Sequence, residues 1–327
     1  MSTKVLLISP YGMNYYGGVQ HQLKILKKEL KNTGLDIKIL SPDSKDFNIG
    51  KPMSIPFNGS KAYTNLLPNR LVVKEALQWA DILHVHEPFI PIFFWRIPIN
   101  KNTIITHHAD LSKFFTFLQN KLIHKERNAF AVTAVSKVAS TGLPNDLTLK
   151  IIPNTIKVKK SNLNNMNNFS FLFIGRDEKR KNFKLFKKLA TRMNSFQYNF
   201  TAITNHNKKS PGITIYDNPD ENLKKSIFSQ CNIYLAVNTH GESFGITLIE
   251  AITEGCLVVC SDIKAFKDVL GPTGIYFENN SIDSLLDTVE KLKVLDLNNE
   301  HQKQLQYVQK YNTTKVITAW ISLYSQI

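Results

Sequence analysis

Short β-branched segments alternate with amphipathic helical segments along most of the chain, and this alternation restricts the fold more than any other feature. The pattern predicts βαβ units and a parallel sheet that is covered by helices on both faces. In the first half, the expected strands are Lys4–Ser9, Asp36–Leu40, Ile82–His86, Thr103–Thr106, Ala131–Val135 and Lys150–Ile152. The helices expected between them are Val19–Asn32, Arg70–Trp79, Leu111–His124 and Lys137–Leu143.

A polar segment without periodicity, residues 157–168, interrupts the alternation and is typical of a connection between domains. The strands expected after it are Phe169–Ile174, Tyr198–Ile203, Ile213–Tyr216, Asn232–Ala236, Cys256–Cys260 and Gly274–Phe277. We therefore predict an α/β chain with two Rossmann-like, doubly wound domains, over residues 1–156 and 157–312. Ligands of such folds bind at the carboxyl ends of the strands, and we expect them in a central cleft that the two domains face.

The composition excludes several other classes of protein. Two domains of about 150 residues fit the length of 327. Three cysteines without a C-x-x-C pair cannot form a disulfide framework, which indicates a reducing compartment and no structural zinc site. The longest apolar stretch, residues 89–99, contains Arg96 and is too short to span a bilayer. The first apolar run is typical of a strand and not of a signal peptide, so we expect a cytoplasmic protein.

The net charge of +15 favours polyanionic partners such as anionic lipid or phosphorylated ligands. Only six of the 41 basic residues are arginine, and asparagine and isoleucine are also abundant. A codon bias of the genome therefore explains the lysine excess as well as a function does. Few aromatic residues interleave with basic ones in a nucleic-acid pattern, so we expect no nucleic-acid partner.

Two motifs have the character of anion sites. Gly17-Gly18 lies between the first strand and the first helix, where free amides and the helix dipole attract a phosphate. No Gly-Lys-Ser/Thr follows, so it is not a P-loop, and a plain glycine-rich turn is the alternative. Arg176 and Lys181 follow the first strand of the second domain, where they would neutralise a diphosphate. A solvated run of charges is the alternative for this second motif.

The most informative motif is the segment from Gly241 to Ala251, which lies between two expected strands. A helix is expected over 244–254, and the amides at its start, from Ser243 to Ile246, would hold phosphate or sugar oxygens. Glu250 would accept hydrogen bonds from sugar hydroxyls one turn further along the same face. Glu242 precedes the helix and would reach the transferred group. The alternative is a pair of surface glutamates.

Two further features allow more than one interpretation. His107 and His108 follow a strand, and either would face the cleft or serve as a hydrogen-bonded structural histidine. We expect no metal site there, because no third ligand has suitable spacing. Two stretches, 70–79 and 113–127, mix basic and bulky apolar residues. Such helices lie on anionic bilayers or present their apolar stripe to the core.

Taken together, these motifs resemble the retaining GT-B glycosyltransferases with an E-x7-E signature. The resemblance rests on Gly17-Gly18-Val19-Gln20, on Gly175-Arg176 with Lys181, and on Glu242-Ser243-Phe244-Gly245 with Glu250. Pro10-Tyr11, Ile55–Ser60, His84-Val85-His86-Glu87-Pro88 and Ser261–Phe266 are similar to segments of the actinobacterial phosphatidylinositol α-mannosyltransferases. The resemblance runs to about residue 280, and it implies that a final helix, 313–327, packs back on the N-terminal domain.

The resemblance implies an enzyme that moves mannose from GDP-mannose to phosphatidylinositol, with retention, at the cytosolic membrane face. It implies no metal or other cofactor, and a protein that is peripheral on an anionic phospholipid surface. The implied catalytic residues are His108 and Glu242. The implied contacts with the nucleotide sugar are Gly17, Gly18, Arg176, Lys181, Ser243, Phe244, Gly245, Ile246 and Glu250. The implied contacts with the inositol phosphate are Tyr11, Asn14, Gln20, Asn58, Lys113 and Arg180.

The chain departs from that family at several positions. Tyr63 and Asn65 stand where the family has two arginines, and Ala109 stands where it has a threonine. The family's glycine-rich turn is replaced here by Thr204-Asn205-His206-Asn207-Lys208. The expectation that the donor nucleotide is GDP and not UDP therefore rests on the resemblance alone. One alternative is therefore a related glycosyltransferase with another nucleotide sugar and a different lipid or saccharide acceptor. The other alternative is a non-catalytic module that binds anionic lipid or nucleic acid.

Overall fold

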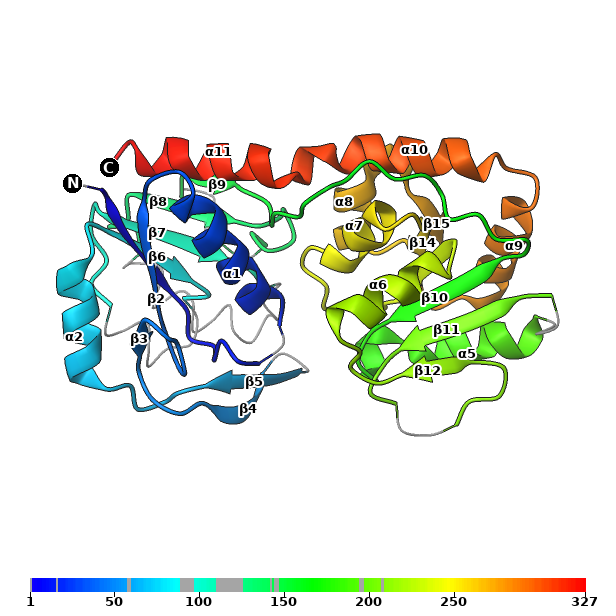
Figure 1. The fold of residues 1–327 in the computed structure, drawn as a ribbon, viewed down its shortest axis with the longest axis horizontal. Coiled ribbons are helices and arrows are strands. Elements are labelled where there is room, and N and C mark those ends of the chain that lie inside the picture. The colour runs from blue at the N-terminus through cyan, green and yellow to red at the C-terminus, as the bar shows by residue number, and fades with distance from the viewer. Residues whose placement is uncertain are drawn as a thin grey trace. The chain divides into compact units, whose positions relative to one another are not determined.

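The chain forms two compact units, each with its own parallel sheet (Figure 1). The computed structural model describes residues 2–15, 17–57, 60–88, 97–109, 126–141, 143, 147–193, 197–206 and 209–327. Unit 1 comprises Met1–Thr155 with Thr313–Ile327, and unit 2 comprises Ile156–Asn312. The division lies one residue before the boundary predicted from the sequence. The predicted cleft between the domains stays a prediction.

Unit 1 contains a seven-stranded parallel sheet in the order β3-β2-β1-β6-β7-β8-β9. Its strands are β1 Lys4–Ile8, β2 Asp36–Ser41, β3 Phe47–Asn48, β6 Ile82–His86, β7 Thr103–His107, β8 Ala131–Ala134 and β9 Leu149–Ile151. Its helices are α1 Gly18–Lys31, α2 Arg70–Trp79 and α11 Thr313–Tyr324, and a separate hairpin joins β4 Met53–Phe57 to β5 Ser60–Thr64.

Both faces of the unit 1 sheet are buried, because alternate side chains of each strand pack on opposite sides. On one face, Val5 and Leu7 of β1 pack with apolar side chains of α1 and α11. On the other face, Leu6 and Ile8 pack with Val73 of α2. The C-terminal helix therefore completes the core of the unit in which the chain begins.

Unit 2 contains a six-stranded parallel sheet in the order β12-β11-β10-β13-β14-β15. Its strands are β10 Ser170–Ile174, β11 Asn199–Ile203, β12 Thr214–Tyr216, β13 Ile233–Ala236, β14 Leu257–Ser261 and β15 Ile275–Phe277. Its helices are α5 Phe183–Arg192, α6 Glu221–Ser229, α7 Ile246–Thr253, α8 Lys264–Leu270, α9 Ile282–Leu292 and α10 Leu297–Val308, with short 3-10 turns η1 Lys179–Lys181, η2 Gly271–Thr273 and η3 Gln309–Tyr311. Phe171 and Phe173 of β10 lie in a core with Phe183 and Phe186 of α5.

The two sheets share one topology, and that topology locates the sites. In unit 1 the first strand lies between β2 and β6, and in unit 2 β10 lies between β11 and β13. The strand order reverses beside β1 in unit 1 and beside β10 in unit 2. In a fold of this kind, the connections that follow the two strands at the reversal leave toward opposite faces of the sheet. Ligands of folds with this topology bind at such points, at the carboxyl ends of the strands. Residues after β1 and β6, and after β10 and β13, therefore line the two candidate sites.

The strands predicted from the sequence are confirmed to within one residue at each end. The sequence analysis missed β3 and the hairpin of β4 and β5. β3 has only two residues, and Met53-Ser54-Ile55-Pro56-Phe57 lacks the alternation that marks a strand.

Two predicted helices differ from the structure. Lys137–Leu143 was expected to be helical, but its described residues form turns. The hydroxyls of Ser140 and Thr141 both donate to the Lys137 carbonyl, and such bonds compete with a helix. The helix expected from residue 244 begins at Ile246, because Gly245 has a left-handed conformation with φ of 76°. The helix Leu111–His124 lies outside the described residues.

The polar segment 157–168 is an anchored part of unit 2. The Asn164 amide nitrogen lies 2.8–3.0 Å from the carbonyl oxygens of Phe228, Cys231 and Glu254. A Cβ at Gly255 would lie 2.5 Å from the Asn164 side-chain oxygen, so glycine is required for this close approach. No helix in the described part of the chain has the length and apolar character to cross a membrane.

Each unit uses one buried glutamine to satisfy backbone groups that its sheet leaves open. In unit 1, Gln22 of α1 accepts a bond from the Thr155 amide and donates one to the Thr155 carbonyl. In unit 2, Gln304 of α10 does the same for Val258 of β14, at 2.9 Å each, and also donates to the Thr273 carbonyl. Both side chains act as a substitute for a neighbouring strand.

The substitution Gln304→Leu should lower the free energy of unfolding by about 3 kcal/mol, because three buried backbone groups lose their partner at constant side-chain volume. Urea denaturation measures this loss. The matched control is Gln306→Leu on the exposed side of the same helix, which should change stability by less than about 0.5 kcal/mol. Equal unfolding midpoints for the two variants would contradict this role of Gln304.

Candidate functional site

The densest group of charged side chains in unit 2 lies where the strand order reverses. Lys181, at the end of η1, follows β10, and its Nζ lies 2.7 Å from Oε2 of Glu242, which follows β13. The same oxygen accepts a 2.8 Å bond from the Asn238 amide. Asn238 is held in turn, because its carbonyl accepts a bond from the Ser261 hydroxyl. The structure thus brings together two predicted site residues and one, Asn238, that the sequence analysis missed.

Glu242 is ionised at neutral pH. Burial would raise the pKa of its carboxyl, but the Lys181 ammonium, with smaller contributions from Arg180 and the Gly245 amide, lowers that pKa below 4.5. A fixed carboxylate beside cationic side chains suits the recognition of hydroxyl groups that lie next to an anion.

A second carboxylate organises the arginines. Glu178 pairs with Arg176 at 3.1 Å and with Arg180 at 2.9 Å. The Arg180 side chain is 15% exposed and also donates to the Gly241 carbonyl, whereas the Arg176 side chain is 49% exposed. Arg180 therefore has a fixed position, and Arg176 presents its guanidinium to solvent at the same edge of the sheet.

The loop before α7 holds the remaining predicted donor residues. Ser243 is partly exposed, and Ile246 is the first residue of α7. The Phe244 side chain is buried and packs edge-on against Tyr311, with ring centroids 5.2 Å apart, so only its backbone is available to a ligand. Glu250 lies one turn into the helix and pairs with Lys224 of α6 at 3.1 Å. Glu250 and Glu242 thus pair with different lysines.

In unit 1, the loop between β1 and α1 is shaped by Gln20. Its buried side chain donates to the Gly12 carbonyl. A Cβ at Gly17 would lie 2.2 Å from the Gln20 side-chain oxygen, so a larger residue there would displace the end of the Gln20 side chain. Gly18 starts α1, and Asn14 is exposed nearby in the sequence. Gln20 therefore supports the loop from inside, while Asn14 is accessible.

Tyr11 and Glu87 follow the two central strands of unit 1, β1 and β6. Burial, with a smaller contribution from Glu87, raises the pKa of Tyr11, so the phenol is neutral. Burial likewise raises the pKa of Glu87. Its Oε1 accepts bonds from the amides of His108 at 2.5 Å and of Ala109 at 2.8 Å. The sequence analysis quoted Glu87 in a motif but assigned it no role.

His108 is buried beside β7, and its Nε2 lies 2.9 Å from Nδ1 of His86. Burial, with a smaller contribution from His107, lowers the pKa of His108 to about 3. The ring is therefore neutral at physiological pH and acts through hydrogen bonds and not through a charge. Asn58 and Lys113, both predicted acceptor contacts, lie outside the described residues.

No group of three His, Cys, Asp or Glu side chains among the residues that the structure describes is arranged to hold a metal ion. The absence of a metal requirement stays a prediction.

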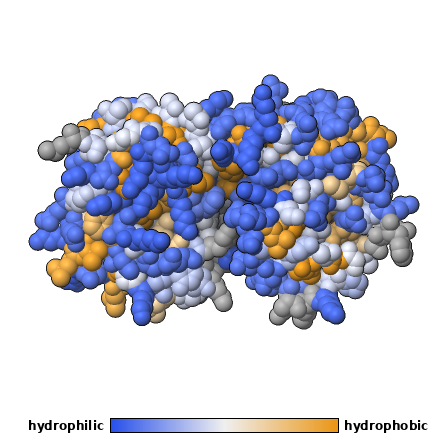
Figure 2. Space-filling view, viewed as in Figure 1, coloured by the Kyte–Doolittle hydropathy of each residue, from blue (hydrophilic) through white to orange (hydrophobic). Residues whose placement is uncertain are grey.

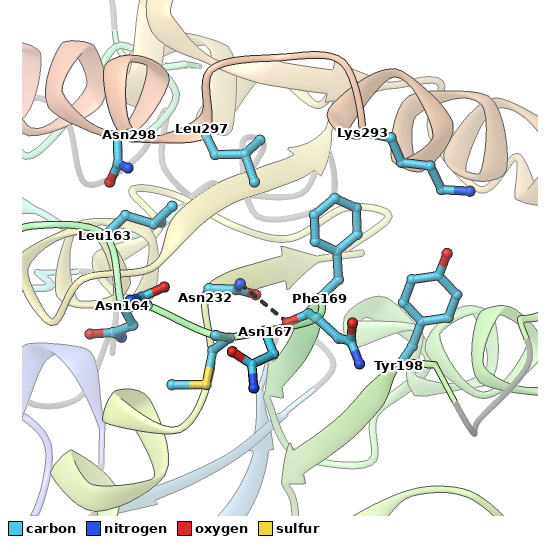
Figure 3. A pocket seen from close by; sticks show the side chains of 12 residues that line it. Leu163, Asn164, Asn167, Phe169, Tyr198, Asn232, Lys293, Leu297 and Asn298 are labelled. Atoms are coloured by element: carbon cyan, nitrogen blue, oxygen red, sulfur yellow. Dashed lines mark hydrogen bonds between the residues drawn. The ribbon is translucent and has the colours of Figure 1, made fainter.

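A pocket of about 620 Å3 occupies the opposite edge of the unit 2 sheet (Figure 3). It is lined by residues 163–169 with Tyr198, Asn232, Lys293, Leu297 and Asn298. Asn232 precedes β13, and its amide donates to the Asn168 carbonyl and accepts from the Ser170 amide. The pocket therefore lies at the amino ends of the strands and is separate from the group around Glu242.

Comparison with known proteins agrees with this arrangement. The family described as glycosyl transferases group 1 matches residues 154–311. A phosphatidyl-myo-inositol mannosyltransferase of Mycobacterium leprae (strain TN) is 28% identical over 305 residues, which are 82% of this chain and 80% of that protein.

Solved structures show the same fold. Sucrose-phosphate synthase from Thermosynechococcus elongatus superposes with a TM-score of 0.74 at 15% identity, over 99% of this chain and 98% of that one. Anabaena Alr3699/HepE in complex with UDP and glucose gives a TM-score of 0.69 at 14% identity, over 99% and 100% of the two chains. The chain therefore has the GT-B fold, and its residues 154–311 form a glycosyl transferases group 1 domain.

Proposed function

We propose that the protein transfers mannose, with retention of configuration, from GDP-mannose to phosphatidylinositol. The observation that carries the proposal is the contact of Lys181 and Asn238 with one oxygen of Glu242, where the strand order of unit 2 reverses. The mannosyltransferase named among the relatives supports the sugar and the acceptor. The solved complex of a fold neighbour with UDP and glucose supports a nucleotide sugar as donor.

The cations and amides of unit 2 fit the chemistry of a departing nucleoside diphosphate. Arg176, Lys181 and the amides at the start of α7 would stabilise the charge that develops on the diphosphate. Glu242, fixed and ionised, would accept hydrogen bonds from the mannose hydroxyls. Glu250 would contact the ribose while Lys224 holds its other side. No metal is needed in this scheme, because cationic side chains and backbone amides of the protein would stabilise the negative charge on the diphosphate.

Unit 1 would supply the acceptor side. Tyr11 and Asn14, on the loop that Gln20 supports from inside, would hold the inositol phosphate together with Asn58 and Lys113. Arg180, which lies in unit 2, is the further contact that the resemblance implies. His108 is neutral and would orient a hydroxyl group at the reacting carbon. The acceptor hydroxyl would attack from the face that the diphosphate leaves, and the leaving phosphate would take its proton.

An exposed surface at α2 fits peripheral binding to an anionic membrane. Figure 2 shows an apolar group over this part of unit 1. Leu67 and Leu71 are 82% and 78% exposed, and Met53 of β4 is 61% exposed. Arg70 and Lys74 are exposed on the same helix. Apolar side chains next to basic ones are typical of helices that lie on anionic bilayers.

One observation favours the alternative acceptor. Tyr63 stacks on Tyr15 with ring centroids 3.8 Å apart, and it stands where the family that the chain resembles has an arginine. The side-chain nitrogen of Asn65 donates to the Lys51 carbonyl, and its side-chain oxygen accepts a bond from the Leu67 amide. An aromatic pair suits a saccharide or a less phosphorylated lipid better than a second phosphate.

Purified protein with labelled GDP-mannose and phosphatidylinositol vesicles should produce lipid-linked mannose. The variant Glu242→Gln should lower kcat by about 100-fold or more, because an oriented anionic contact to the sugar is lost. Its matched control is Glu290→Gln, an exposed carboxylate on α9 that should leave turnover unchanged. Transfer from UDP-sugars alone, or to a saccharide but not to the lipid, would replace the proposed substrates with the alternative.

The variant Lys181→Met should show a pH-dependent loss of stability. The pKa of Glu242 in the folded protein is below 4.5, so its pairing stabilises the fold above that pH and is lost as the pH falls through the lowered pKa. The variant should therefore be less stable by about 1.5–3 kcal/mol at pH 7, with a difference that shrinks below pH 4.5. Urea denaturation from pH 7 to pH 3 measures this. Lys179→Met, exposed in the same turn, is the control, and an equal loss at every pH would argue against the pairing.

The double substitution Leu67→Asp with Leu71→Asp should weaken binding to phosphatidylinositol vesicles by at least tenfold, because it replaces exposed apolar area, which the bilayer would cover, with charge. Vesicle flotation measures the bound fraction, and binding should also fall with salt. Val294→Asp changes an equally exposed apolar residue of unit 2 and serves as the control. Unchanged flotation of the double variant would remove α2 from the membrane surface.

A further inference from the structure

Two histidine rings of β6 lie inside unit 1, on the face of the sheet that α11 covers. His84 and His86 point to the same side because strand side chains alternate. Their ring centroids are 4.0 Å apart, and Trp320 of α11 lies 4.6 Å from the His84 ring. Neither histidine has any exposed area. Buried imidazoles cost free energy unless they are hydrogen-bonded, so each ring needs an explanation.

The hydrogen bonds of His84 explain its presence and fix its tautomer. The Thr133 hydroxyl donates to the Ile105 carbonyl, so it accepts from the Thr106 hydroxyl. Thr106 therefore accepts from Nε2 of His84 at 2.7 Å. The remaining nitrogen, Nδ1, then accepts from the Tyr324 hydroxyl at 2.7 Å. Tyr324, His84 and Thr106 thus each donate to the next group of this hydrogen-bond network, and Thr133 ends it at the Ile105 carbonyl. Every polar side-chain atom of the network has a partner.

His86 has no such set of partners. Its Nδ1 bonds to His108, and its Nε2 has no hydrogen-bond partner among the described residues. The ring borders a cavity of about 10 Å3, which is about the size of one water molecule and which Thr155 and Trp320 also line. An apolar side chain would fill this place at lower cost. The one hydrogen bond that His86 makes with a described protein group therefore serves His108.

The backbone of His108 is fixed from the same segment. Glu87, directly after His86, has a left-handed backbone with φ of 52°, which is unfavourable for a residue with a Cβ. Its carboxylate accepts bonds from the amides of His108 and Ala109. Two successive residues of one strand end thus hold the ring and the backbone of the same histidine.

We propose that His86 is a positioning residue, which fixes the orientation and the tautomer of the His108 ring through its Nδ1. The catalytic value of this contact rests on the proposed function, in which His108 orients a hydroxyl group at the reacting carbon. The His84 ring lies against the His86 ring from behind, and Trp320 and Tyr324 pack against His84 in turn.

Two substitutions separate the two nitrogens of His86. The amide of an asparagine occupies the place of Nδ1, and the amide of a glutamine reaches the place of Nε2. The variant His86→Asn should therefore keep the bond to His108, and His86→Gln should lose it. The matched control Tyr324→Phe removes a hydroxyl from the same buried group but leaves the bond between His86 and His108 untouched.

The first measurement is histidine 15N NMR, which reports the ring tautomer without any substrate. The His108 ring should show one tautomer in the wild type, in His86→Asn and in Tyr324→Phe, and an average of two tautomers in His86→Gln. Two tautomers of His108 in the wild type would overturn the proposal without any variant, even if His86→Gln did not fold.

The second measurement is steady-state transfer. His86→Gln should lower kcat by up to about 100-fold with an unchanged KM, and His86→Asn should restore most of that loss. Equal losses in both variants, or wild-type kcat in His86→Gln, would overturn the proposal. If the wild type transfers no mannose to phosphatidylinositol, the proposed function fails, while the NMR result still decides the role of His86.

Discussion

The burial of both faces of each parallel sheet is the constraint on which the rest of the structure depends. Strands such as β1 and β14 have apolar side chains on both sides, so the interior of each unit has little room for polar groups. Charged side chains such as Lys181 and Glu242 are displaced to the strand ends, beside the point where the strand order reverses, and ligands of such folds bind there. Where the sheets leave backbone groups open, Gln22 and Gln304 satisfy them with amides that imitate a strand.

In unit 2 this constraint produces a preorganised group of balanced charges. Glu242 and Glu178 hold Lys181, Arg180 and Arg176 in place, so the cations need little rearrangement to meet an anion. Arg176 has its carboxylate partner and still presents half of its side chain to solvent. A diphosphate would compete with Glu178 for this arginine, whereas the buried contact of Lys181 with Glu242 would persist beside it.

In unit 1 the same burial has the opposite electrostatic effect. Burial raises the pKa of Tyr11 and lowers that of His108, so it favours the neutral forms of both side chains. Tyr11 and His108 are thus neutral hydrogen-bonding groups, which suit the recognition of hydroxyl groups. Under the proposed function, the cationic group of unit 2 would stabilise the leaving diphosphate, and the neutral groups of unit 1 would orient the incoming hydroxyl.

The alternation of short apolar runs with amphipathic helices was sufficient to predict the two parallel sheets and, except for β3, their strands to within a residue, but not the hairpin of β4 and β5. Local sequence determined these features because burial on both faces of a strand is visible in the strand itself. The sequence could not reveal Asn238 as a partner of Glu242, Lys224 as a partner of Glu250, or His86 as a partner of His108. Nor could it show that Phe244 belongs to the core. Each of these depends on contacts between segments distant in the chain or on the direction of a side chain, and only the tertiary structure decides which atoms meet.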